Sequence, residues 1–246
     1  PQNFAFYAHG QGHAVTAEGL QLILGWFDKH LMGGKATKSF PVEKSGFADL
    51  GIAAPASECR GVVCAQDNKG RQLAVACLLD MSRVGSILVT DIDSGETTQH
   101  EFPESTGSDQ FAAWAPYASM LSRNGRFYTF AGKHLVEFDL DRREVVFSGV
   151  PAASESCYLG TAIVDGPDGR IYAASYPNSR LISFDPATKA MTDHGQLDPK
   201  EQYPESLAFD DAGWLYCGIG TARTNIVAFD PRSGEFRQLV QEEARK

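Results

Sequence analysis

The sequence predicts a mainly β protein made of four similar four-stranded units, with one amphipathic helix near its beginning. Two spacings carry this prediction. A turn ending in glycine occurs four times, with the glycines at 70, 125, 169 and 213, so the steps are 55, 44 and 44 residues. A second turn, marked by aspartate, occurs at 91, 139, 185 and 230, with steps of 48, 46 and 45 residues. A period of this length is typical of β units that must pack on one another.

The third repeat contains the expected elements in order. Residues 158–164 are predicted to form a first strand, and the turn at 165–169 supplies glycine where a positive φ is needed. Residues 171–175 and 181–185 form the second and third strands, and a hairpin loop at 186–189 leads into a last strand near 191–193. The other repeats have second and third strands at 73–77 and 87–91, at 127–130 and 135–139, and at 214–218 and 225–230.

Four short strands per unit describe a β-propeller blade. The Phe-Asp-Pro-x-(Thr/Ser)-Gly-like turn after the third strand, at 184–189 and 229–234, resembles the repeats of SMP-30/gluconolactonase-like, streptogramin-lyase-like and NHL-type propellers. This resemblance extends over about residues 50–240. Four blades are at the low end for a closed ring. The array is therefore either partial or half of a larger ring, which self-association or further blades would complete.

The beginning of the chain differs from the repeats. Residues 1–34 are predicted to form a strand, a loop and a helix, because apolar side chains at 20, 23, 24, 27 and 31 share one helical face and Gly33 ends it. Residues 35–48 are a polar linker. We expect three parts: the segment 1–34, the linker 35–48 and the propeller repeats 49–246.

The run FYAHGQGHAVTAEGLQLILGWFDKHL, residues 6–31, resembles the end of an α/β-hydrolase domain of the esterase and dienelactone-hydrolase type. The resemblance implies that His13 is the catalytic histidine, a general base to a serine nucleophile. That serine needs a G-x-S-x-G elbow, and this pentapeptide does not occur in the chain. If the resemblance holds, the nucleophile lies upstream of Pro1, and we expect no ester hydrolysis from this chain alone.

The charge and hydropathy of the sequence argue against some classes of binding partner. The formal net charge is −9 and the acidic residues are dispersed, which argues against nucleic acid or an anionic membrane. No run of about 18 uncharged apolar residues occurs, so no membrane span is expected. His9 and His13 have a metal-like spacing, but Gly10 and Gly12 disfavour the helix that such a site needs. We expect no metal and no cofactor, and the sequence does not indicate a localisation.

Candidate site residues lie where each predicted inner strand begins, at one mouth of a central channel. Aromatic rings combined with carboxylates and a guanidinium suit a polar ligand such as a sugar or uronic acid, although packing rings and rim charges would produce the same pattern. The SMP-30-like resemblance implies a metal-binding glutamate, which Glu205 matches loosely, but its Asn and Asp partners have no clear match. The ligand-binding candidates are Arg60, Trp114, Tyr117, Glu155, Tyr158, Tyr203 and Glu205, and Glu205 is also a catalytic candidate.

Three function classes follow from these observations. The favoured one is a bacterial-type propeller that binds or transforms a carbohydrate-like small molecule, as a lyase, a lactonase or a binder. The second is a non-catalytic accessory propeller attached to an esterase-type hydrolase that is mostly missing from this chain. The third is a protein-interaction scaffold. The sequence leaves open whether the protein is an enzyme.

Overall fold

The computed structural model describes residues 58–79, 85–103, 118–151, 158–220 and 222–245. The chain divides into two units, Pro1–Ala53 and Ala54–Lys246, and every described residue belongs to the second. The predicted N-terminal helix, the linker and His13 lie outside the described residues.

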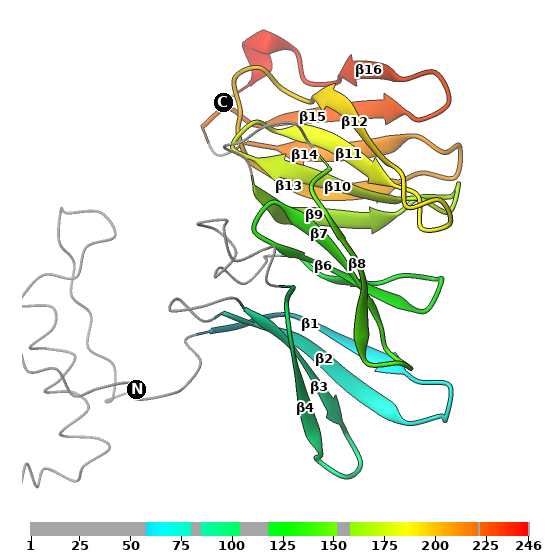
Figure 1. Ribbon diagram of the computed structural model, residues 1–246. Helices are drawn as coiled ribbons and strands as arrows, with labels where there is room; N and C mark the ends of the chain where they lie inside the picture. The colour runs from blue at the N-terminus through cyan, green and yellow to red at the C-terminus, as the bar shows by residue number, and fades with distance from the viewer. Residues whose placement is uncertain (1–57, 80–84, 104–117, 152–157, 221, 246) are drawn as a thin grey trace, which may run out of the picture. The chain divides into compact units, whose positions relative to one another are not determined.

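Sixteen strands in the described residues form four sheets, and each sheet is an antiparallel meander whose strands follow chain order (Figure 1). We call the sheets blades 1 to 4. They confirm the prediction of four four-stranded propeller blades. Blade 1 contains β1 (Glu58–Gln66), β2 (Gln72–Leu79), β3 (Ser86–Asp91) and β4 (Thr97–Glu101); blade 2 contains β5 (Met120–Leu121), β6 (Arg126–Ala131), β7 (His134–Asp139) and β8 (Glu144–Gly149). Blade 3 contains β9 (Tyr158–Asp165), β10 (Ile171–Tyr176), β11 (Arg180–Phe184) and β12 (Met191–Gln196); blade 4 contains β13 (Pro204–Phe209), β14 (Leu215–Ile219), β15 (Asn225–Asp230) and β16 (Glu235–Gln238).

Two kinds of turn explain the two spacings seen in the sequence. In the turn after each first strand the glycine has a φ between 78° and 85°, a region that favours glycine. In the turn after each third strand the aspartate caps the backbone with its own carboxylate. Asp185 Oδ1, for example, accepts the N–H groups of Ala187 at 2.9 Å and Thr188 at 3.3 Å. Both turns reverse the chain with local chemistry, so each meander is encoded within its own repeat.

The cores lie between the blades. Side chains alternate across each sheet, so every blade has a forward face, toward the next blade in the chain, and a backward face. Tyr128 and Tyr172 lie on the forward faces of blades 2 and 3 and are 0% exposed. Phe127 and Ile171 lie on the backward faces of the same blades and are at most 1% exposed. Apolar clusters join blades 1 and 2, blades 2 and 3, and blades 3 and 4. Burying a side chain of this size contributes about 1.5–3 kcal/mol.

In blades 1 to 3 a ring on the outer strand contacts the phenylalanine that precedes the turn aspartate of the next blade. The ring centroids are 5.1 Å apart for His100 and Phe138, 4.7 Å for Phe147 and Phe184, and 4.9 Å for His194 and Phe229. Burial lowers the pKa of both histidines, so they pack as neutral rings. The Phe-Asp pattern of the repeats therefore marks one residue for the contact between blades and one for the turn.

The described chain ends in a short 3₁₀ turn, η2 (Glu242–Ala244), followed by Arg245. The Arg245 guanidinium lies 2.8 Å from Asp198, and the two side chains are 6% and 0% exposed. Asp198 Oδ2 also accepts the Asn225 side-chain amide at 2.7 Å. Burial raises the pKa of Asp198, but these contacts and two backbone N–H groups outweigh it and hold the pKa below its usual value. The end of the chain is thus fastened to blades 3 and 4.

Candidate functional site

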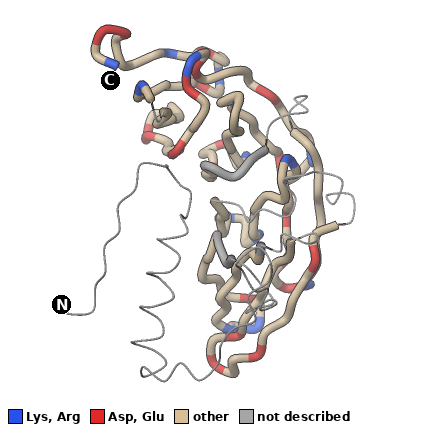
Figure 2. Tube along the Cα trace, turned by 90° about the vertical axis from the view of Figure 1, so that its left-hand side faces the viewer, with Lys and Arg blue, Asp and Glu red and all other residues tan. Residues whose placement is uncertain are grey.

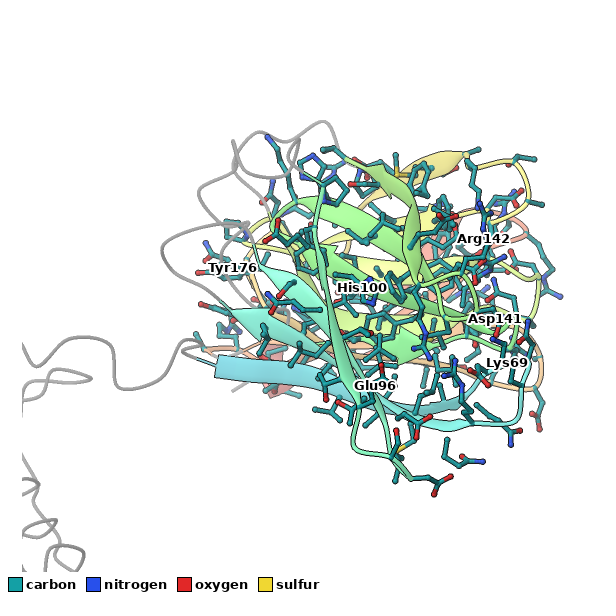
Figure 3. All side chains as sticks on the ribbon, turned by 60° about the horizontal axis from the view of Figure 1, so that its bottom comes forward. Lys69, Glu96, His100, Asp141, Arg142 and Tyr176 are labelled. Atoms are coloured by element: carbon teal, nitrogen blue, oxygen red, sulfur yellow. The ribbon has the colours of Figure 1, made fainter. Side chains whose placement is uncertain are left out.

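The first strands of consecutive blades meet between blades 1 and 2 and between blades 3 and 4, and between blades 2 and 3 the first strand of blade 3 meets the second strand of blade 2. β1 contacts β5, and β9 contacts both β6 and β13. The first strands of the blades all begin at one end of the sheets, which we call the loop end. The glycine and aspartate turns lie at the opposite end, which we call the turn end. Figure 3 shows Tyr176 at the loop end and Lys69, Asp141 and Arg142 at the turn end. The sequence places its candidate residues at the loop end.

A β-bulge lies near the start of three of the first strands. The register shifts between Arg60 and Val63 in β1 and between Pro204 and Ser206 in β13, and it shifts in β9 opposite Ala174 and Ser175 of β10. A bulge leaves an extra residue unpaired and re-aims its side chain, and bulges are frequent beside active sites. In β13 the extra residue is Glu205.

The Glu205 carboxylate is exposed at this bulge. Within the part of the chain that the structure describes, no hydrogen bond or ion pair holds it. Other acids near this end are engaged instead. Glu201 is 5% exposed and accepts the Arg223 N–H at 2.5 Å, and hydrogen bonds from Lys200 and Arg223 lower the pKa of Glu242 to about 2. Glu205 is therefore a carboxylate at the loop end that is available to a ligand.

An aromatic pair lies beside Glu205 in the chain. The rings of Tyr203 and Tyr176 have centroids 4.1 Å apart at an interplanar angle of 35°. The Tyr203 carbonyl accepts the Gly220 N–H at 2.8 Å, which ties this segment to the end of β14. Both tyrosines are half-buried, so each keeps an accessible part. Rings of this kind offer flat apolar area with a polar hydroxyl at the edge.

The structure brings together some of the residues predicted from the sequence and not others. The structure has Tyr203 and Glu205 at the loop end. For Arg60 and Tyr158 the structure places the backbone, in β1 and β9, with Tyr158 opposite Tyr176 in the register. Tyr176 is the residue that sequence reasoning missed; its signal is that it ends the second strand directly before Pro177. Four predicted residues lie outside the described residues: His13, Trp114, Tyr117 and Glu155.

His194 lies where blades 3 and 4 pack on each other. His194 donates or accepts a 2.8 Å hydrogen bond with Ser183 and lies between the rings of Tyr172 and Phe229, so it is a packing residue between blades 3 and 4. Among the described residues, no group of three or more His, Cys, Asp or Glu side chains could hold a metal ion.

Charge and hydropathy add two findings. Figure 2 shows acidic and basic positions interspersed along the described chain. Turn-end acids are mostly paired, as Asp67 is with Arg71 at 2.7 Å. Among the described residues, no helix is long and apolar enough to cross a membrane.

Comparisons with known proteins identify the fold and no family. No family model matches this chain, and no curated protein matches it in sequence. The extracellular domain of a proposed one-component system from B. thetaiotaomicron has a similar structure, with a TM-score of 0.52, 12% identity, and coverage of 74% of this chain and 22% of that chain. A protein of unknown function from Bacteroides thetaiotaomicron has a TM-score of 0.50, 12% identity, and coverage of 76% and 44%.

A third structure, provisionally assigned as a gluconolactonase, has a TM-score of 0.49, 15% identity, and coverage of 76% of this chain and 64% of that chain. This chain therefore spans less than two thirds of each of the three proteins. At such low identity, the likeness to the first two shows the fold alone. The described part of the chain is an array of β-propeller blades.

Proposed function

We propose that this protein is a propeller that binds a carbohydrate-like small molecule at the loop end, through Tyr176, Tyr203 and Glu205, and that it acts there as a lyase, a lactonase or a binder. The observation that carries the proposal is the half-buried tyrosine pair together with a carboxylate, two residues along the chain from Tyr203, that a β-bulge exposes. The comparisons support the scaffold and are silent on the substrate.

The chemistry of these groups suits a sugar. The apolar C–H face of a sugar ring stacks on an aromatic ring, and its hydroxyls donate hydrogen bonds to a carboxylate. Glu205 would also be the group placed to take up a proton from the ligand, if a reaction occurs. Arg60 lies on β1 at the same loop end and would pair with the carboxylate of a uronic acid.

The test is binding to a glycan library that contains neutral sugars and uronic acids. Glu205→Ala and Arg60→Ala should each weaken binding of the responsive glycan by about tenfold or more, because each removes a charged hydrogen-bonding group. The matched control is Glu96→Ala, which removes an exposed glutamate from the turn end and should bind as the wild type does.

Thermal unfolding midpoints of Glu205→Ala and Glu96→Ala should stay near that of the wild type, because Glu205 and Glu96 are exposed. Wild-type glycan binding by both Glu205→Ala and Arg60→Ala would contradict the proposed site. Equal loss in the Glu96→Ala control would assign the effect to stability or to net charge.

A further inference from the structure

Two blade faces have no neighbouring blade among the described residues: the forward face of blade 4 and the backward face of blade 1. Each of the other six faces packs on an adjacent blade in one of the three apolar clusters. Because the repeats are equivalent, residues on the two end faces can be compared with their buried counterparts.

Blade 4 exposes large apolar side chains on its forward face. The residue four positions before the turn aspartate is at most 1% exposed in blades 1 to 3, as Ile87, Leu135 and Leu181, whereas Ile226 is 45% exposed. Leu239 is 46% exposed and lies beside Ile226, whose carbonyl accepts the Leu239 N–H at 2.8 Å. Tyr216 is partly exposed where Tyr128 and Tyr172 are fully buried.

Blade 1 also exposes side chains on its backward face that are buried at the corresponding positions of the other blades. Ile92 directly follows the turn aspartate and is 53% exposed, whereas its counterpart Leu140 is 3% exposed in the cluster between blades 1 and 2. Leu88 and Thr90 are partly exposed, whereas the corresponding residues of blades 2 to 4 are at most 2% exposed: Val136, Ile182 and Val227, and Phe138, Phe184 and Phe229.

We infer that these two faces bind each other between two copies of the chain, with blade 4 of one copy packing its forward face on the backward face of blade 1 of the second copy. This contact repeats the arrangement that joins blades 1 to 4 within the chain. Ile226, Leu239 and Ile92 are exposed, so this contact is not made within one copy.

The residues that differ between the two end faces and the packed faces favour a second copy of the chain as the partner. Between blades within the chain, a ring on the outer strand contacts a phenylalanine of the next blade. On the end faces, Leu239 stands at the position of the ring and Thr90 at the position of the phenylalanine, so neither residue is aromatic. Between blades 2 and 3, Glu137 of the forward face pairs with Lys189 of the backward face at 2.6 Å. The corresponding end positions are Ala228 and Gly95, so docking would leave neither charge buried without a partner.

The test is the oligomeric state of the full chain, measured by sedimentation velocity from about 1 µM to 100 µM, the range over which weak and moderate contacts dissociate. Wild type should associate. Ile226→Asp, which alters only the forward face, and Ile92→Asp, which alters only the backward face, should each weaken association at least about tenfold, because each would bury an unpaired charge.

Mixing the two variants distinguishes this contact from other dimers. Each variant keeps one intact face, so an equimolar mixture should form a dimer that neither variant forms alone; such a head-to-tail contact is heterologous. Val150→Asp, at a 38% exposed position outside both faces, is the control and should associate as the wild type does. A monomeric wild type at the highest concentration would overturn the inference. So would a mixture that stays monomeric, or variants that still self-associate.

Discussion

One backbone position shows how single residues join the blades. The fourth residue after each turn aspartate has a positive φ, between 58° and 74°. It is glycine in blades 1 and 4 but Arg143 and Lys189 in blades 2 and 3. A side chain in this region costs about 1 kcal/mol. Both cations reach back to an acid of the preceding blade: Arg143 lies 3.7 Å from Asp67, and Lys189 lies 2.6 Å from Glu137. The unfavourable φ is thus offset by a charge pair between blades.

Replacing Lys189 tests this pair. Lys189→Asn, which tolerates a positive φ, should lower the free energy of unfolding by roughly 1–3 kcal/mol, because Glu137 is 4% exposed and would lose its cation. The double variant Glu137→Ser with Lys189→Gly copies the Ser183 and Gly234 combination of blades 3 and 4 and should recover most of that loss. Urea unfolding of both variants measures the change in the free energy of unfolding. A double variant no more stable than Lys189→Asn would refute the explanation.

At this scale the sequence predicts part of the candidate site. Tyr203 and Glu205 follow from their position just before and within a predicted inner strand. Tyr176 could not be found in the same way, because it ends the second strand and reaches Tyr203 through a contact that only the folded blades create. The bulge that exposes Glu205 is equally hidden, since a bulge is defined by the register of two strands.

At the scale of elements, the turns are the best predicted feature. Glycine at a positive φ and aspartate that caps backbone N–H groups act within a few residues, so the sequence spacing reveals them directly. Strand order within each blade follows, because tight turns join antiparallel neighbours. The identity of the outer-strand rings was not predicted: His100 and His194 contact phenylalanines of the next blade, which are far away in sequence.

The turn aspartates predict a loss of stability in acid. The N–H of Ala187 lowers the pKa of Asp185, and the N–H of Ser94 lowers the pKa of Asp91. A lowered folded-state pKa stabilises the fold above the unfolded value of about 3.9, and this contribution is lost as the pH falls through the folded-state pKa. The urea midpoint should therefore fall between about pH 4 and pH 2.

The matched variant replaces both carboxylates by amides. Asp91→Asn with Asp185→Asn keeps an oxygen to accept the backbone N–H groups but removes the titrating charge, so its urea midpoint should decline less steeply in acid than that of the wild type. Identical pH profiles for the two proteins would show that these turns do not cause the acid sensitivity.

At the scale of the whole molecule, the blades depend on one another. Each apolar cluster takes side chains from two consecutive blades, so a single blade has no core of its own. The repeat period predicts this dependence. It does not predict how the faces match, because an inter-blade contact joins residues tens of positions apart; Cys77 and Thr129, separated by 52 residues, are an example.

The contact between Cys77 and Thr129 offers the most direct measurement of the central claim, that consecutive repeats pack face to face as blades. Cys77 Sγ lies on the forward face of blade 1, 3.2 Å from Thr129 Oγ1 on the backward face of blade 2. A disulfide bond is about 2.05 Å long, so the pair in a Thr129→Cys variant has roughly 1 Å to close. Mild oxidation followed by peptide mapping should recover a disulfide between Cys77 and the introduced thiol in the folded protein. If the new thiol stays reduced under these conditions, or forms a disulfide with any other cysteine of the chain, the face-to-face packing of blades is wrong.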